Sequence, residues 1–183
     1  PPRRNQAINF LTDWQPSHDP APDDVDNTDK RTKLHVLVRS LHQLEYLTEY
    51  DLASVYCDFQ DIREYKQAVA IGRKNGLKTF LATPRIQKPS EIGLFHAIAK
   101  HDPEGVLVRN LSGLEYFREK CEIISDFSLN ATNQITVDVL LKMGSRQVTP
   151  SYDLNRDQLM TLAHHCRPTD LQIVIHQHMP MFH

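Results

Sequence analysis

The sequence predicts an α/β protein with a TIM-barrel-like (β/α) fold that is incomplete, with about seven parallel strands and about six helices. Short β-branched or apolar runs recur along the chain, and segments with helical periodicity separate them. The runs are apolar throughout, which is expected of parallel strands covered on both faces. Their first residues lie about 17 to 27 positions apart, close to the shortest spacing that a strand–helix unit needs.

Seven runs predict the strands, and their uniform spacing favours a barrel over an open doubly wound sheet. The runs are LHVLV (34–38), ASVYC (53–57), KTFLA (78–82), GVLVR (105–109), EIISD (122–126), RQVTP (146–150) and LQIVI (171–175). A dinucleotide-binding Rossmann fold is disfavoured, because the turn after the first strand, RSLHQ, contains no glycine.

The segments between the strands carry helix start and stop signals. Five of the predicted helices have such signals and lie within residues 61–76, 90–103, 111–120, 130–145 and 155–166. The first ends at Asn75-Gly76 and the fourth at Gly144, and the second and fifth begin with Ser90 and Asn155 as N-caps.

The first 33 residues differ from the rest in composition. They include a stretch rich in proline and aspartate, QPSHDPAPDDVDNTDKR, which predicts a linker or an extended N-terminal segment. Residues 34–183 are then expected to form one (β/α) barrel-like domain that is truncated at its C-terminal end. Because an incomplete barrel leaves an open edge, a homodimer is one expected assembly.

Composition narrows the class of protein. A net charge of -2 gives no global attraction to nucleic acid or to an anionic membrane, so a nucleic-acid partner is not favoured. No apolar run approaches the roughly 20 residues of a membrane span, so no membrane partner is expected. The N-terminus has no secretory signal, and the three cysteines are widely spaced, which favours a reducing, cytoplasmic location.

Polar or charged residues follow every predicted strand, where the active face of such barrels lies. They are Arg39 after the first strand, Asp58 after the second, Arg85 after the third, Arg109 and Asn110 after the fourth, Asp126, Ser128 and Asn130 after the fifth, Tyr152 and Asp153 after the sixth, and His176 and His178 after the seventh. Loop residues are also commonly helix caps, a role that Asp61, Ser90, Asn130 and Asn155 suit equally well.

Three arginines at one rim require negative charge nearby. Either the aspartates 58, 126 and 153 supply it, or an anionic ligand such as a carboxylate, a phosphate or an RNA backbone does. On the last predicted strand, His176 and His178 share one face, a spacing that also occurs in metal sites. The pair alone is weak evidence of a metal, so no residue is assigned as a metal ligand.

Several segments together resemble peptidase family U32, the collagenase-like proteases. The most specific are DFSLNATN (126–133), TPSYDLN (149–155) and HQHMPMFH (176–183), and the likeness runs from about residue 34 to the end. The resemblance implies a (β/α) barrel-like catalytic domain, in agreement with the alternation of strands and helices.

The family resemblance also bears on cofactors. Some members are named proteases, and others take part in hydroxylating RNA or a quinone precursor, in some cases with an iron–sulfur cluster on four cysteines. In the family, the cysteine-bearing segment follows the strand that HMPMFH resembles. The resemblance therefore implies a fragment of a longer parent, whose metal or iron–sulfur cofactor the cysteines of this chain do not bind.

Three functions follow from these observations. The first is a hydrolase acting on peptide bonds, with Asp126, Asp153 and His176 as catalytic candidates and a peptide or other anionic substrate. Its substrate would be bound by Arg39, Asp58, Arg85, Arg109, Asn110, Asn130, Tyr152 and His178. The second is iron–sulfur-dependent hydroxylation of RNA or a quinone precursor, and the third is a non-catalytic barrel scaffold. No Ser-His-Asp triad or HExxH motif is visible, so a peptidase activity follows from the resemblance alone.

Overall fold

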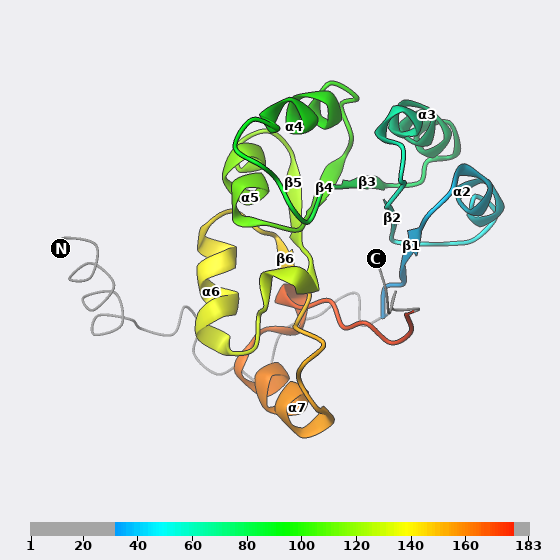
Figure 1. The fold of residues 1–183 in the computed structure, drawn as a ribbon. Helices are drawn as coiled ribbons and strands as arrows, with labels where there is room; N and C mark the ends of the chain where they lie inside the picture. The colour runs from blue at the N-terminus through cyan, green and yellow to red at the C-terminus, as the bar shows by residue number, and fades with distance from the viewer. Residues whose placement is uncertain (1–31, 178–183) are drawn as a thin grey trace.

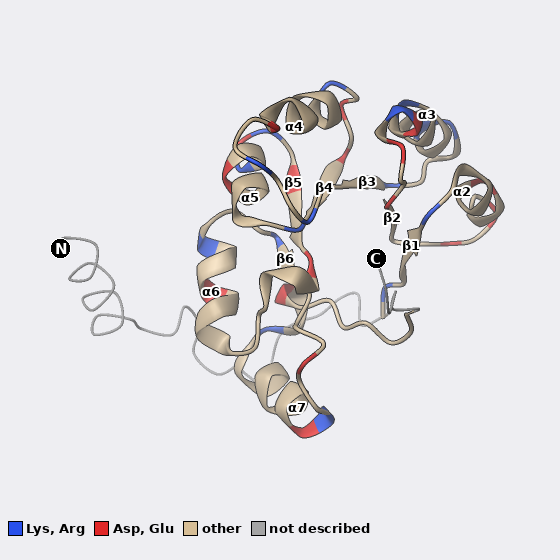
Figure 2. Cartoon of the chain, viewed as in Figure 1, with Lys and Arg blue, Asp and Glu red and all other residues tan. Residues whose placement is uncertain are grey.

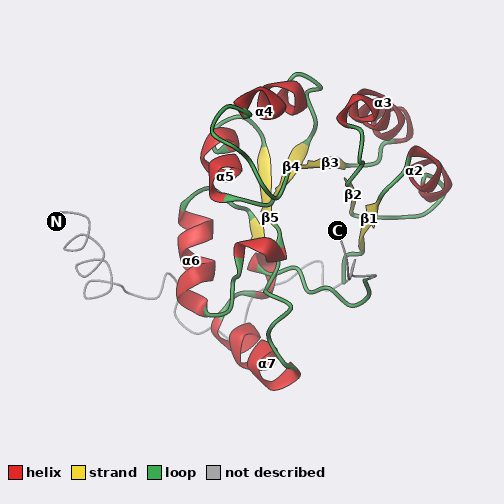
Figure 3. Ribbon diagram, viewed as in Figure 1, coloured by secondary structure: helices red, strands yellow, loops and turns green. Residues whose placement is uncertain are grey.

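The structure, a computed structural model, describes residues 32–177 and confirms the incomplete barrel. Six parallel strands lie side by side in chain order, and the sheet curls so that the helices cover its outer face (Figures 1 and 3). The strands are β1 (His35–Val38), β2 (Ser54–Cys57), β3 (Thr79–Ala82), β4 (Gly105–Val108), β5 (Glu122–Ser125) and β6 (Gln147–Val148). The helices are α2 (Leu41–Leu47), α3 (Tyr65–Asn75), α4 (Ile92–Ala99), α5 (Leu111–Phe117), α6 (Gln134–Lys142) and α7 (Arg156–His165).

Alternate residues of each strand face opposite sides of the sheet, and both sides are apolar. On β2, Val55 and Cys57 belong to the large core shared with the helices, whereas Tyr56 belongs to a second cluster. The second cluster occupies the inner face, and its members are Tyr56, Phe80, Ala82, Leu107 and Ile124. All four residues of β2, β3 and β4 are buried, which explains why these strands have no polar alternation in the sequence.

Helix starts are tied to strand ends by short polar side chains. Ser40, Asn110, Asn133 and Asn155 each accept a hydrogen bond from the backbone N–H group three residues ahead. Asn155 forms a full capping box with Gln158, as the sequence predicts. Two predicted cap positions are wrong: α4 is preceded by Glu91 rather than Ser90, and α6 by Asn133 rather than Asn130.

Two glycines stand where other residues are disfavoured, one by its backbone conformation and one by crowding. Gly76 ends α3 in the left-handed conformation, with φ of 67°, as the sequence signal at Asn75-Gly76 predicts. Gly105 begins β4 beside the ring of Phe80, and a Cβ atom there would also lie 2.6 Å from the carbonyl oxygen of Glu122. The absent side chain therefore lets β4 approach both β3 and β5.

Charged residues gather at the N-terminal ends of the strands, opposite to the end where the strands run into the loops before the helices. Lys78 and Glu122 form an ion pair of 2.7 Å, and Arg146 lies 3.5 Å from the other oxygen of Glu122. The ammonium group of Lys78 also lies 5.2 Å from the centroid of the Phe80 ring. The apolar inner cluster thus separates this charged end from the end where the strands run into the loops.

The seventh predicted strand, residues 171–175, does not form. Only Leu171 is buried and bridged to β6, through Val148, while Ile173 is 44% exposed and Ile175 is 85% exposed. The following chain leaves the edge of β6 and runs toward β1 (Figure 1). Gln172 holds it there, because its amide accepts from the hydroxyl of Tyr56 at 2.6 Å and donates to Gln147 at 2.7 Å.

Two sets of predictions lie outside the described residues. One concerns the predicted N-terminal segment, residues 1–33, of which 1–31 lie outside the described range. The other concerns the role of His178. None of the described helices has the length and the apolar character that crossing a membrane requires.

Candidate active site at the strand ends

Arg109 lies at the centre of the site, at the end of β4. Its side chain is only 8% exposed, and Nη1 donates to Oδ1 of Asp58 at 2.7 Å. On its other side, Nε lies 3.8 Å from Oδ2 of Asp126, too far for a hydrogen bond. The guanidinium group therefore connects the ends of three strands, β2, β4 and β5.

The strand register brings these residues together. The ladder bonds continue one residue past the strands, since the N–H groups of Asp58 and Asp126 donate to Val38 and Val108 at 2.9 Å. The N–H group of Arg109 donates to the hydroxyl of Thr83 at 3.0 Å. Because parallel strands end at the same edge of a sheet, the residue after each strand joins one rim.

The arginines around Asp58 stabilise its negative charge. Burial opposes ionisation of this half-buried carboxyl group, but the hydrogen bond and the charge of Arg109, with smaller effects of Arg39 and Arg85, lower its pKa below the ordinary value. Asp58 is therefore a carboxylate at neutral pH, and it serves as the counter-ion of Arg109 rather than as an acid.

Asp126 begins the loop after β5. Its side chain accepts hydrogen bonds from the hydroxyl group of Ser128 at 2.8 Å and from the N–H group of the same residue at 3.3 Å. Both bonds use Oδ2, the oxygen that also lies nearest Arg109. The Ser128 hydroxyl contact fixes the orientation of the carboxyl group, and the other oxygen, Oδ1, has no protein donor among the described residues.

An aromatic pair continues the rim from β5 to β6. The rings of Phe127 and Tyr152 stack with centroids 3.8 Å apart and planes 16° apart, and the guanidinium carbon of Arg85 lies 5.0 Å from the Phe127 centroid. Burial and the charge of Asp126 raise the pKa of Tyr152 to about 12, although Arg85, Arg109 and Arg39 oppose the shift. Tyr152 thus keeps its proton at neutral pH and can donate a hydrogen bond.

The structure brings six of the predicted residues into one cluster. Direct contacts join Asp58, Arg109 and Asp126, stacking joins Arg85 to Tyr152 through Phe127, and the charge of Arg39 acts on both Asp58 and Tyr152. We call this set, Arg39, Asp58, Arg85, Arg109, Asp126 and Tyr152, the rim cluster. Blue and red segments adjoin the sheet in the charge-coloured view (Figure 2).

The other predicted residues have different surroundings. Asn110 caps α5 and donates to the carbonyl group of Pro84 at 2.8 Å, so it joins the loops after β3 and β4. Asn130 is exposed in the left-handed conformation, with φ of 55°. Asp153 is exposed and accepts from the Ser151 hydroxyl at 3.2 Å, and His176 is exposed in the segment that follows Leu171.

Sequence reasoning missed Phe127 and Tyr65. Phe127 follows Asp126 directly, so its place in the loop after β5 was the available signal. Tyr65, the first residue of α3, is buried and donates to the carbonyl group of Ala82 at 2.9 Å. Burial, followed by the charge of Asp58, raises its pKa, and its hydroxyl group ties α3 to the end of β3 beneath the rim cluster.

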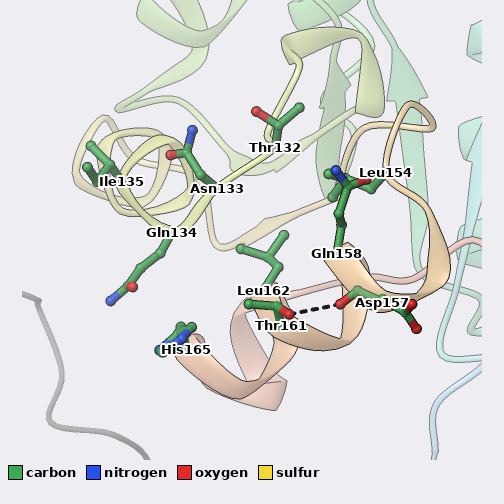
Figure 4. A pocket seen from close by; sticks show the side chains of 10 residues that line it. All are labelled: Thr132, Asn133, Gln134, Ile135, Leu154, Asp157, Gln158, Thr161, Leu162 and His165. Atoms are coloured by element: carbon green, nitrogen blue, oxygen red, sulfur yellow. Dashed lines mark hydrogen bonds between the residues drawn. The ribbon is translucent and has the colours of Figure 1, made fainter.

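A pocket of about 540 Å³ lies elsewhere, between α6 and α7 (Figure 4). Its walls are the start of α6, with Asn133 and Ile135, and the α7 side, with Leu154, Leu162 and His165. The pocket is outside the sheet and contains none of the rim cluster. We place the candidate site at the rim, because within residues 32–177 buried charged side chains from the ends of several strands meet there.

The described residues do not fit an iron–sulfur cluster or a metal ion. Cys57 is buried on β2, Cys121 precedes β5 and Cys166 follows α7, and burial raises the pKa of each thiol, to about 12, 11 and 11 respectively. An iron–sulfur cluster is commonly held by four cysteines around one volume, whereas these three cysteines lie on separate elements. Within residues 32–177, no group of three or more His, Cys, Asp or Glu side chains is arranged to hold a metal ion.

No protein-family model matches the chain, and no curated protein matches it. Among solved structures, the chain is similar to one described as the structure of the U32 peptidase Mk0906. The TM-score is 0.62 at 12% sequence identity, over 78% of this chain and 68% of that chain. The likeness shows a shared fold, and it agrees with the family resemblance of the sequence at the level of the fold.

Proposed function

We propose that the chain carries the substrate-binding rim of a hydrolase that acts on peptide bonds. The observation that carries the proposal is the buried guanidinium group of Arg109 between Asp58 and Asp126, at the active face of a barrel-like sheet. The solved structure with a similar fold is described as a peptidase. Buried, opposed charges in one cluster are typical of active sites, since folding alone rarely requires them.

The rim cluster offers groups for each step of hydrolysis. Asp126 acts as the general base: its carboxylate takes a proton from water as the water oxygen bonds to the peptide carbonyl carbon. The hydroxyl group of Tyr152 donates to the oxyanion that forms. The C–N bond then breaks, and the acid form of Asp126 returns the proton to the leaving amine. Water and one peptide bond are consumed, and one carboxyl and one amine group are produced.

The remaining predicted catalytic residues, Asp153 and His176, belong to the same proposal as acid–base candidates. Both are exposed, and imidazole is well suited to protonating a leaving amine near neutral pH. Individual Asp153→Asn and His176→Gln variants would assign their roles, since only a group that transfers protons changes the pH profile of the rate.

Peptide hydrolysis by Asp126→Asn and Tyr152→Phe variants tests the proposal. We expect each to lower kcat by roughly 100-fold or more, because each removes a proton acceptor or an oxyanion donor. Gelatin and casein are suitable substrates, and circular dichroism verifies that the variants fold. Asp51→Asn, at an exposed position before β2, is the matched control. Equal rates for all three variants and the parent would mean that hydrolysis does not occur at the rim cluster.

A further inference from the structure

We propose that Arg39 and Arg85 form a carboxylate-binding subsite, so that the rim selects peptides bearing a free carboxylate. The inference builds on the proposed hydrolase function, because it names the substrate class of the same site. It also concerns binding, which is measured separately from hydrolysis. The carboxylate has two sources in a peptide, an acidic side chain or the C-terminus, and both present the same planar, singly charged group.

The first argument is the balance of charge. Three arginines of the rim cluster face two carboxylates, and both carboxylates are next to Arg109. Among the described residues, no carboxylate lies within ion-pair distance of Arg39 or Arg85. One positive charge is thus in excess at the rim. A single carboxylate would balance it, whereas a doubly charged phosphate would reverse it.

The second argument is an unfilled hydrogen-bonding position. The side chain of Arg109 is more than nine-tenths buried, and its Nε has no hydrogen-bond acceptor. A buried donor without an acceptor costs about 1–3 kcal/mol. The other such atom in the described residues, Oδ2 of Asp138, lies on α6, outside the rim cluster. Because this donor is closed off from solvent and faces Oδ2 of Asp126 at 3.8 Å, Arg109 is already engaged with the two aspartates, and Arg39 and Arg85 are left to bind a ligand.

The third argument is the position of the Arg85 side chain. Its guanidinium carbon lies 5.0 Å from the centroid of the Phe127 ring, and the ring of Tyr152 stacks on Phe127. A cation–π contact of this kind restrains the position of the guanidinium group without using its N–H groups, which stay available to an acceptor. Two in-plane N–H groups match the two oxygens of a carboxylate.

Arg39 completes the subsite from the neighbouring strand. It follows β1 directly, and Asp58 follows β2, which is paired with β1 through Val38 and Cys57. The backbone N–H group of Arg39 donates to the side chain of Gln43 at 2.7 Å, so the first turn of α2 fixes the start of its side chain. The guanidinium end is exposed and can move toward a ligand over the rim.

Binding of three short peptides to the full chain tests the inference. Acetyl-Gly-Gly-Gly with a free C-terminus and acetyl-Gly-Glu-Gly-amide each carry one carboxylate, whereas acetyl-Gly-Gln-Gly-amide carries none. Isothermal titration calorimetry in the Tyr152→Phe variant, which keeps all the charges of the rim cluster, measures affinity with little turnover. We expect at least one carboxylate peptide to bind roughly tenfold more tightly than the neutral peptide. The tighter of the two identifies the source of the carboxylate, and inorganic phosphate serves as the competing anion.

Variants of the two arginines locate the binding. Arg39→Gln and Arg85→Gln should each remove most of the carboxylate preference, and added salt should weaken it. The matched control is Arg118→Gln, because Arg118 is exposed after α5, at the opposite end of the barrel. Equal affinity for all three peptides, tighter binding of phosphate, or an equal loss in the control would overturn the inference. Carboxylate binding without hydrolysis would instead contradict the proposed function and leave the subsite standing.

Discussion

Nη1 of Arg109 donates to Oδ1 of Asp58 at 2.7 Å, which links the ends of two strands that are not neighbours in the sheet. β3 lies between β2 and β4, so the ion pair spans its C-terminal end. The chain between these two residues includes two α-helices, α3 and α4, and two strands, β3 and β4. A contact of this kind holds the curvature of the sheet as well as the charge of the rim.

Replacing Arg109 by Ala should destabilise the fold by about 3 kcal/mol, because Asp58 and Asp126 would lose their shared counter-ion. Urea unfolding followed by circular dichroism measures the change. Arg63→Ala is the matched control, since Arg63 also pairs with an aspartate, Asp61, but at the surface. We expect no resolvable change there. A similar loss in both variants would show that burial of the Arg109 pair is not what stabilises the fold.

Acid should remove the contribution of Asp58 to stability. Its pKa is lowered in the folded state, so its contribution is complete above the ordinary value of 3.8 and is lost as pH falls below that value toward the folded pKa. Asp58→Asn should therefore be less stable than the parent at neutral pH, with a difference that shrinks below about pH 3.8. Unfolding free energies across an acid series measure it, and a difference independent of pH would contradict the assignment.

Adding one methyl group to β4 should disturb the sheet. In Gly105→Ala, the new Cβ would meet the ring of Phe80 and the backbone of Glu122, so we expect a loss of about 2 kcal/mol. The control is Gly93→Ala in α4, where nothing lies within 4 Å of the added atom. That change should stabilise the protein by about 0.5 kcal/mol, because alanine favours a helix. Thermal unfolding of both variants distinguishes crowding from a general effect of replacing glycine.

The three cysteines should react slowly with iodoacetamide in the folded protein. Burial raises the pKa of Cys57 to about 12 and of Cys121 and Cys166 to about 11, so near pH 8 roughly one thiol in a thousand or fewer is ionised. Mass spectrometry after timed alkylation measures the rates, with the urea-unfolded chain as reference. Labelling of any of the three as fast in the folded chain as in urea would contradict the burial described here.

Strand order and the rim could be predicted from the sequence because each depends on local pattern. Apolar runs bounded by turns located β1 to β6 within about one residue at their starts. The residue after each run then reaches the rim by geometry alone. The same rule failed at residues 171–175, because Ile173 and Ile175 suit a strand by composition but have no neighbouring strand to cover them. Burial of an apolar run depends on its partners, which the run itself does not encode.

The contacts between side chains across the rim could not be predicted from the sequence. The pattern SDFSLNA places Asp126 and Phe127 in one loop, but not the stacking of Phe127 on Tyr152, which lies one strand further along. The side-chain bond from Tyr56 to Gln172 joins residues 116 positions apart. Such pairings depend on the curl of the whole sheet.

An apolar inner layer separates two groups of charged residues, one at each end of the strands. Its members are Tyr56, Phe80, Ala82, Leu107 and Ile124. Glu122 begins β5 and belongs to one group, whereas Asp126 directly follows β5 and belongs to the other. Four residues of extended chain place their Cα atoms roughly 13 Å apart. That exceeds the Debye length of about 8 Å in physiological salt. The surface charge at the Lys78 end can therefore be redesigned for solubility with little effect on the electrostatics of the rim cluster.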